Sequence, residues 1–130
     1  MILAIYTCLA ILCIVFLQSG IDKVFHFKSE KDFVQSHFRR SPLNKMSGIL
    51  FIILTILEIT SGVLSAGGII HLYLHDNVIM ANLASVLSSI TLLSLLLGQR
   101  VAKDYAGAQT IIIYLIPVVL LFITLELYKL

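Results

Sequence analysis

The sequence predicts an all-α membrane protein, a bundle of four antiparallel transmembrane helices with a short amphipathic interfacial helix in the first loop. Of its 130 residues, 59% are hydrophobic and only 12% are charged, whereas a soluble domain averages about 45–50% and about 25%. The apolar residues also form four blocks, each near the roughly 20 helical residues that cross a bilayer. These observations exclude a soluble enzyme, a nucleic-acid-binding protein and a secreted disulfide scaffold.

The four expected spans belong to a single membrane domain and cover residues 2–21, 46–70, 78–98 and 108–127. The first block has no basic segment before it and no small-x-small cleavage site after it, so we interpret it as a retained span. Short links follow the second and third spans, and short links join antiparallel neighbours. Glycine, alanine and serine on these two spans allow close helix packing in lipid.

The loop of residues 22–45 is expected to contain the amphipathic helix. Ser29 is followed three residues later by Asp32, which is the spacing of a capping box. Apolar and aromatic residues then recur at helical spacing, namely Phe33, Val34, His37 and Phe38. Pro42 cannot continue a helix. We expect this helix to lie on the membrane interface with basic residues toward lipid phosphates, either as a tether or as a docking helix for a partner.

The distribution of basic residues predicts the orientation. Eight of the nine Lys and Arg residues lie in the segments 22–45 and 99–107, and only Lys129 lies on the other side. Because short cytoplasmic loops carry the Lys/Arg excess, we expect these two loops in the cytoplasm and both termini outside. The net charge of +2 follows from this topology and requires no nucleic-acid partner.

Glu58 is the most informative residue, since it stands in the middle of the second block with roughly 18 Å of helix on either side. An ionised carboxylate at the bilayer centre costs about 2.5–3.5 kcal/mol. Counting from the block ends places Leu9 and Val86 at its level, and the polar residues expected nearby are all hydroxyls: Thr7, Ser85, Ser88 and Ser89.

The basic residues Arg100 and Lys103 are expected roughly 18 Å from Glu58 along the bundle axis. We therefore expect a neutral, protonated Glu58. Its role is either an interhelical hydrogen bond or contact with a ligand or proton in a cavity. In the last span, Pro117 removes a backbone hydrogen bond, and the resulting kink beside Tyr114 is expected to open such a cavity.

A second polar cluster is expected at the cytoplasmic rim, where the first and third spans end. It comprises Gln18, Asp22, Lys23, Arg100, Lys103 and Asp104. The two aspartates are suited to pair with the basic residues as a clasp between loops. The alternative is a site for an anionic headgroup or a partner, because arginine binds phosphate bidentately.

The cysteines and histidines do not form an obvious cofactor site. Cys8 and Cys13 are five residues apart and therefore face different sides of a helix. His71 and His75 lie on one face but lack an obvious third ligand. We expect no metal, haem, iron–sulfur or flavin site, and the sequence shows no catalytic constellation of its own.

Three segments resemble the DoxX family of membrane proteins. The first span ends in Gln18-Ser19-Gly20-Ile21-Asp22-Lys23, which is similar to the family's Ser-Gly-x-x-Lys signature. Leu57-Glu58 followed by Gly62 resembles its acidic second helix. The run GQRVAKDYAGA at residues 98–108 is similar to one in DoxX-like proteins of Bacteroidetes type. The resemblance covers nearly the whole chain and implies a four-helix protein of the bacterial inner membrane.

The resemblance further implies an accessory role in redox chemistry, because DoxX was named for small subunits of quinol oxidase and thiosulfate:quinone oxidoreductase systems. We accordingly expect a subunit of a quinone- or thiol-linked redox complex, or a homo-oligomer, with quinone or membrane lipid in an intrabundle cavity. Two alternatives stay open. One is an isomerase-like protein that binds lipid or another hydrophobic small molecule through Glu58, and the other is a structural assembly factor.

Overall fold

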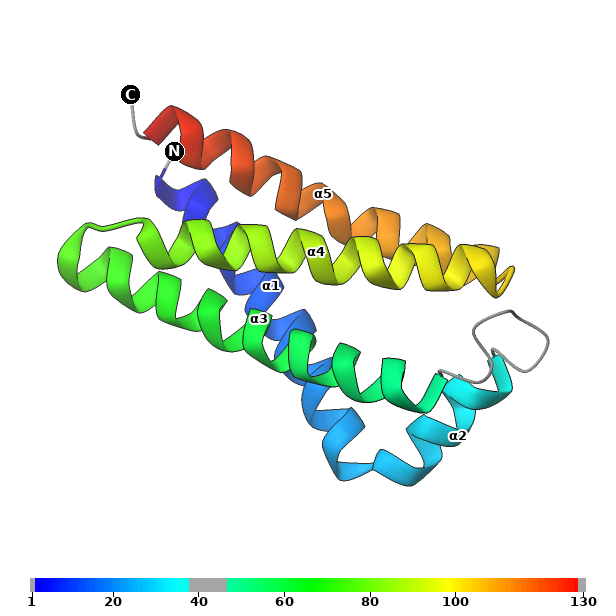
Figure 1. Cartoon of the computed structure of the whole chain (residues 1–130). Helices are drawn as coiled ribbons and strands as arrows, with labels where there is room; N and C mark the ends of the chain where they lie inside the picture. The colour runs from blue at the N-terminus through cyan, green and yellow to red at the C-terminus, as the bar shows by residue number, and fades with distance from the viewer. Residues whose placement is uncertain (1, 38–46, 129–130) are drawn as a thin grey trace.

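The computed structural model describes residues 2–37 and 47–128, which fold into five helices (Figure 1). They are α1 (Ile2–Phe25), α2 (Phe27–His37), α3 (Ser47–His75), α4 (Ile79–Val101) and α5 (Tyr105–Tyr128). All of them except α2 are long and apolar enough to cross a membrane. The fold is that of a small multi-pass membrane protein, as the sequence predicts.

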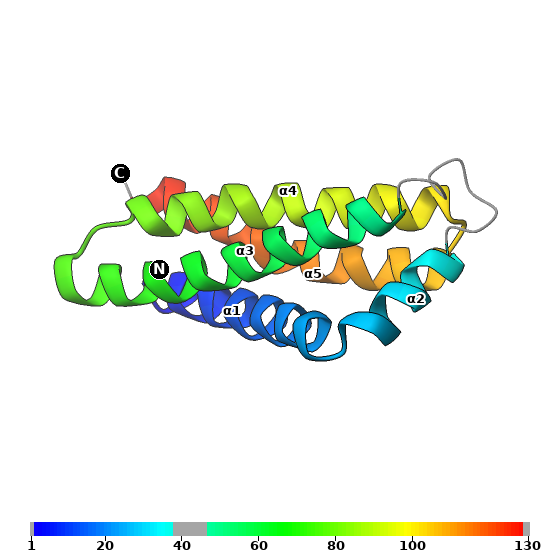
Figure 2. The same cartoon turned by 60° about the horizontal axis from the view of Figure 1, so that its bottom comes forward.

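The four long helices form an antiparallel bundle around an apolar core. Each packs against the next along the chain, α5 returns to pack against α1, and α1 and α4 scarcely touch across the middle. Figure 2 shows the first turn of α1, the α3–α4 turn and the last turn of α5 at one end of the bundle. The largest fully buried side chains of the core include Ile5, Leu9, Leu12, Phe16, Leu92, Leu121 and Leu125.

Glycines set how closely the helices approach one another. A Cβ atom added to Gly68 would lie 3.2 Å from the backbone of Ala81 in α4. A Cβ atom added to Gly62 would lie 3.0 Å from the backbone nitrogen of Leu17 in α1. Small residues at such contacts are typical of helix pairs in lipid, where close packing drives association. These contacts therefore fix the register of α3 against both neighbours.

The helices continue beyond the apolar blocks that predicted them. α1 includes Asp22 and Lys23 and ends at Phe25, and α3 runs on to His75. Once a helix has nucleated, each further residue adds one backbone hydrogen bond, so polar residues after an apolar block do not by themselves end it. The α3–α4 link is consequently short, and it starts at Asp76, whose φ of 50° is the left-handed conformation common after a helix end.

α2 forms in the expected loop but begins before the expected cap. Ser29 lies inside it, and its hydroxyl donates to the carbonyl of His26 at 3.2 Å, so the capping-box prediction is wrong. The ring of Phe27 packs edge-on against Phe51 of α3, with centroids 5.4 Å apart. The side chains of the expected apolar face and Pro42 lie outside the described part of the chain. The interfacial position of this helix stays a prediction.

Candidate functional site

Glu58 is paired with a cation inside the bundle. Its Oε2 atom lies 3.0 Å from Nζ of Lys23 and accepts a 2.7 Å hydrogen bond from the hydroxyl of Ser19. Lys23 also donates to the Ser19 hydroxyl oxygen at 2.8 Å. The side chain of Glu58 is 2% exposed and that of Lys23 is 15% exposed. The three residues thus form a closed, largely buried polar triangle.

The spacing of residues on α1 builds half of this triangle. Ser19 and Lys23 are four residues apart and therefore share one face of the helix. Gly20, next to Ser19, packs against α3 so closely that an added Cβ would lie 2.5 Å from the side chain of Ile59. Because Gly20 has no side chain, α1 approaches α3 closely at Ile59, the residue that follows Glu58. One short segment therefore supplies both the close approach and the polar partners.

The prediction that only hydroxyl groups surround Glu58 is wrong, and the error is one of helix register. Counting from the ends of the apolar blocks placed Leu9 at its level, whereas Ser19 lies there, about 15 Å further along α1. Within α3, Glu58 is roughly 16 Å from the start at Ser47 and roughly 26 Å from the end at His75. It lies off centre, where Lys23 reaches it. The expectation of a protonated Glu58 rests on the absence of a cation nearby. Lys23 is such a cation, so this reason does not hold.

The hydroxyl residues expected beside Glu58 lie elsewhere. Thr7 is exposed in the opposite half of α1 and donates to a carbonyl of its own helix. Ser85 and Ser89 likewise donate to carbonyls within α4. Ser88 is fully buried, and its hydroxyl has no hydrogen-bond partner among the described residues. None of these four residues is bonded to Glu58 or lines the cavity that Glu58 lines.

A different hydroxyl pair, which the sequence did not single out, bridges α3 and α4. The hydroxyl oxygens of Ser61 and Thr91 lie 3.1 Å apart, and both side chains are fully buried. Ser61 stands three residues after Glu58, on the neighbouring helix turn. Finding this pair in the sequence would have required the register between α3 and α4, which the glycine contacts determine.

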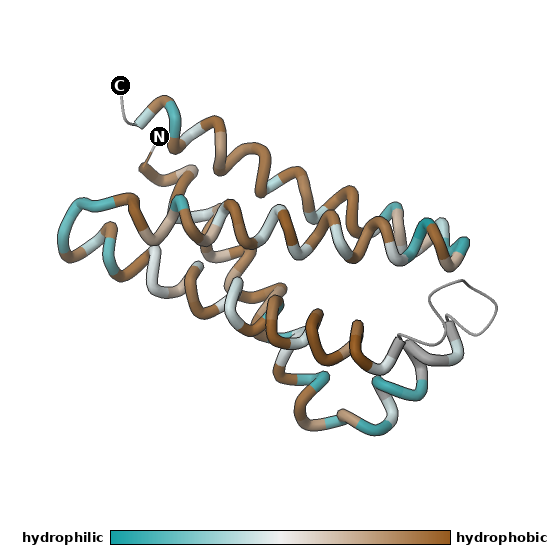
Figure 3. Tube along the Cα trace, in the orientation of Figure 1, coloured by the Kyte–Doolittle hydropathy of each residue, from teal (hydrophilic) through white to brown (hydrophobic). Residues whose placement is uncertain are grey.

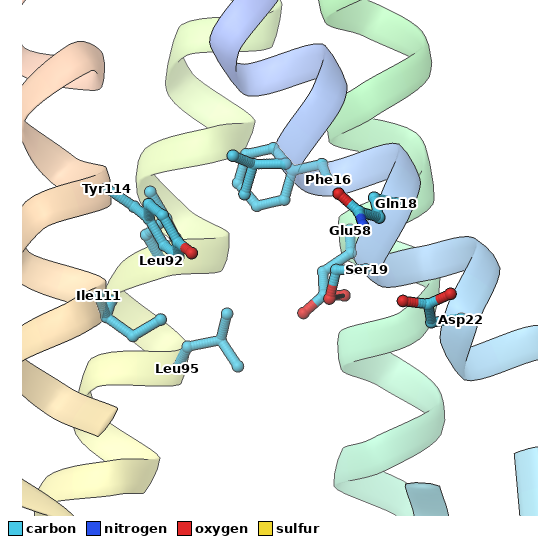
Figure 4. A pocket seen from close by; sticks show the side chains of 10 residues that line it. Phe16, Gln18, Ser19, Asp22, Glu58, Leu92, Leu95, Ile111 and Tyr114 are labelled. Carbon is cyan, nitrogen blue, oxygen red and sulfur yellow. Dashed lines mark hydrogen bonds between the residues drawn. The ribbon is translucent and has the colours of Figure 1, made fainter. Parts of the chain in front are cut away.

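A cavity of about 360 Å³ lies beside the polar triangle, between α1 and α3 on one side and α4 and α5 on the other. Figure 4 shows Ser19, Asp22 and Glu58 on one side of this space, and Leu92, Leu95, Ile111 and Tyr114 on the other. Val15, Phe16 and Gln18 complete its lining. Tyr114 therefore lines a cavity, as the sequence predicts, and Pro117 lies within the same helix.

One carboxylate oxygen of Glu58 is free to bind a ligand. Ser19 and Lys23 both donate to Oε2, and Oε1 accepts no hydrogen bond within residues 2–37 and 47–128. An ionised carboxylate accepts hydrogen bonds through both of its oxygens, and each oxygen has two lone-pair sites. Because Glu58 lines the cavity, its Oε1 atom is suited to accept a hydrogen bond from a molecule that enters there.

The expected cytoplasmic cluster is divided between two places. Gln18 and Asp22 line the cavity together with Glu58, and Lys23 forms the ion pair. Arg100 lies apart from them, with its guanidinium carbon 4.7 Å from the ring centroid of Tyr105.

The link between α4 and α5 holds the other two members of that cluster. Oδ1 of Asp104 accepts a 3.0 Å hydrogen bond from the backbone N–H of Gly107, which caps the first turn of α5. Lys103 is exposed and has a φ of 61°, so it occupies the left-handed conformation that follows many helix ends. Both residues shape the turn between the two helices.

The two cysteines do not form a disulfide, and the two histidines contact each other. Cys8 and Cys13 are free thiols, and the rings of His71 and His75 meet edge-on with centroids 5.0 Å apart. In the part of the chain that the structure describes, no group of three or more His, Cys, Asp or Glu residues could hold a metal ion.

No protein-family model, curated protein or solved structure matches this chain. The features that bear on function are a buried ion pair that leaves one carboxylate oxygen without a hydrogen bond, and a cavity beside it whose opposite wall is apolar apart from Tyr114.

Proposed function

We propose that this small integral membrane protein binds an amphipathic small molecule in the cavity beside Glu58. The observation that carries the proposal is the unbonded Oε1 atom of a carboxylate that is 2% exposed and lines the cavity. The ligand would donate a hydrogen bond to this atom and lay its apolar part against Leu92, Leu95 and Ile111. Ligand sites commonly combine such an apolar lining with a few convergent polar groups.

The size and charge of the cavity support a ligand with a compact, hydroxyl-bearing head. Its volume of about 360 Å³ falls at the lower end of the range of roughly 300–1,000 Å³ that ligand pockets occupy. Lys23 balances the charge of Glu58, and Asp22 is a second carboxylate in the lining, so a neutral head that donates hydrogen bonds suits the cavity better than an anionic one. A hydrogen bond to an ionised carboxylate contributes about 1.5–3 kcal/mol, more than one between neutral groups.

A quinol is the ligand class that best fits both the geometry of the cavity and the resemblance of the sequence to the DoxX family. Its hydroxyl groups are donors and its isoprenoid tail is apolar. Ser19 and Lys23, which bind Glu58, are also the residues of the segment that resembles the DoxX signature. The chain would then be an accessory subunit that holds the quinol, while a partner subunit carries the electrons. A lipid or other hydroxyl-bearing amphiphile bound without any redox partner is the second candidate, favoured by the same Oε1 atom.

The test is to purify the protein from its native membrane in mild detergent and to identify bound small molecules and proteins by mass spectrometry. We expect the wild-type protein to retain an amphiphile and Glu58→Gln to retain about tenfold less, equivalent to about 1.4 kcal/mol. Glu126→Gln makes the same chemical change at an exposed residue near the end of α5 and should retain the wild-type amount.

A second variant keeps the ion pair and fills the cavity from its apolar side. Leu95→Trp should abolish retention, whereas Leu97→Trp, at a residue that is 66% exposed and outside the cavity lining, should not. A quinol together with a co-purified redox protein supports the accessory role, and a lipid without one supports the second candidate. A wild-type protein that carries no amphiphile overturns both.

A further inference from the structure

A second hollow lies on the outer surface of the bundle, between α4 and α5 near their link. It measures about 420 Å³, and its lining residues are Leu96, Arg100, Tyr105, Ala108, Gln109 and Ile112. A shallow trough of about 330 Å³ follows it along α5, lined only by the apolar residues Ile112, Leu115, Ile116, Val119 and Leu120. Because Ile112 belongs to both linings, the two hollows form one continuous surface, here termed the α4–α5 groove.

The wide end of the groove is cationic. Arg100 is the charged residue among those that line it, and its guanidinium group lies over the ring of Tyr105. Stacking on an aromatic face leaves the N–H edges of a guanidinium group available for bidentate bonds to a phosphate. Within the described residues the Arg100 side chain has no salt bridge. The Gln109 amide stands at the same end and offers two further donors.

The narrow end of the groove is apolar and has the length of a lipid chain. Its residues recur at the spacing of one face of α5, and Ile112, Ile116, Val119 and Leu120 are all exposed. From Ala108 to Leu120 the helix rises about 18 Å, close to the roughly 15 Å depth of one leaflet's hydrocarbon layer. Figure 3 shows the corresponding change from hydrophilic residues at the α4–α5 link to hydrophobic residues along α5.

We propose that the α4–α5 groove binds an anionic phospholipid. Its phosphate is held by Arg100 and Gln109, and one acyl chain lies along the trough from Ile112 to Leu120. Charge complementarity and length both favour this occupant, because a single molecule then matches a cationic end and an apolar track of leaflet depth. A free phosphate ion would use only the end at Arg100 and would leave the trough unfilled. Neither Arg100 nor the trough lines the cavity at Glu58, so this inference does not depend on the proposed function.

The test is native mass spectrometry of the whole protein in detergent, titrated with phosphatidylglycerol and, separately, with phosphatidylcholine. We expect phosphatidylglycerol to bind at least tenfold more tightly than phosphatidylcholine. Arg100→Gln should weaken the binding of phosphatidylglycerol about tenfold. Lys103→Gln removes the same charge three residues further along the chain, at a residue outside the groove lining, and should leave the affinity within about twofold.

The tail and the headgroup are tested separately. Ile116→Trp places a bulky ring in the trough and should weaken phosphatidylglycerol binding, whereas Ile113→Trp, on an exposed part of α5 outside the lining, should not. Glycerol 3-phosphate should fail to compete, because it lacks the acyl chain. Equal losses for Arg100→Gln and Lys103→Gln, equal binding of the two lipids, or competition by glycerol 3-phosphate would overturn the proposal.

Discussion

The effect of Lys23 on the stability of the protein depends on Glu58, and the effect of Glu58 depends on Lys23. Removing two charges from water costs several kcal/mol per ion, which their attraction offsets only when both are present and well bonded. Here Ser19 and Lys23 share one oxygen of the carboxylate, and Lys23 keeps 15% of its surface exposed. The pair is therefore sensitive to the loss of one partner and tolerant of the loss of both.

We expect Lys23→Met to lower the free energy of unfolding by about 3 kcal/mol, the lower end of the range for breaking a buried ion pair, because it strands the charge of Glu58. The double variant Lys23→Met/Glu58→Leu should recover most of this loss. Thermal denaturation of Lys23→Met, Glu58→Leu and the double variant in detergent measures the effect. If the double variant is as unstable as the sum of the two single variants, Lys23 and Glu58 are not energetically coupled.

The position of this pair shows which part of the site the sequence could provide. Its polar members were all visible: Glu58 in the middle of an apolar block, and Ser19 and Lys23 four residues apart. Their contact was not visible, because it depends on how far α1 slides along α3. Hydropathy changes slowly along a span and locates it only to within a few residues, whereas a shift of one turn replaces every neighbour of a buried carboxylate.

Glycines at the contacts between helices limit how far one helix can shift along its neighbour. Gly62 in α3 faces Leu17, and the side chain of Leu17 would lie 2.7 Å from an added Cβ, with its backbone nitrogen at 3.0 Å. Gly67 in the same helix faces only the flexible end of Met80, which lies 2.5 Å from an added Cβ. The two glycines are therefore a matched pair, one packed against a backbone and the other against a movable side chain.

We expect Gly62→Ala to lower the free energy of unfolding by about 1–3 kcal/mol, as overpacking does when neighbours cannot move. Gly67→Ala should be neutral or stabilising, since Met80 can change rotamer and alanine favours a helix by roughly 1 kcal/mol over glycine. Melting temperatures of the two variants in one detergent provide the comparison. A Gly62→Ala protein as stable as Gly67→Ala would show that this contact does not fix the register.

The sequence predicts which helices form more accurately than it predicts where each helix begins and ends. Each of the four apolar blocks became one long helix, because in lipid a spanning segment has to satisfy its own backbone hydrogen bonds. α1 and α3 extend beyond the apolar blocks, at Asp22–Phe25 and His71–His75, where polar residues continue the helix. α2 also began before its expected cap, since Phe27 packs against Phe51, a tertiary contact that local spacing does not contain.

In the bundle as a whole, the Glu58 cavity and the Arg100 end of the α4–α5 groove lie in the same half, while the apolar trough continues past the middle of α5 to Leu120. This half lies toward the end that carries the α1–α2 and α4–α5 links (Figure 1). The sequence segments 22–45 and 99–107 hold eight of the nine basic residues. If the Lys/Arg excess faces the cytoplasm, both ligands have their polar heads in the cytoplasmic leaflet, and the anionic lipids of that leaflet supply the occupant of the groove.

The distribution of basic residues also predicts how the chain is oriented in the membrane. We expect a C-terminal alkaline phosphatase fusion after Leu130 to be active and a C-terminal green fluorescent protein fusion to be dark, because both termini lie outside the cytoplasm. Replacing Arg100 and Lys103 by glutamine should leave this result unchanged, since the basic residues of the first loop still mark the cytoplasmic side. A fluorescent fusion protein, together with an inactive phosphatase fusion, would show that the C-terminus lies in the cytoplasm and that the topology is the reverse of the predicted one. It would place the polar heads of both ligands in the outer leaflet and would remove the argument that the cytoplasmic leaflet supplies the lipid for the groove at Arg100.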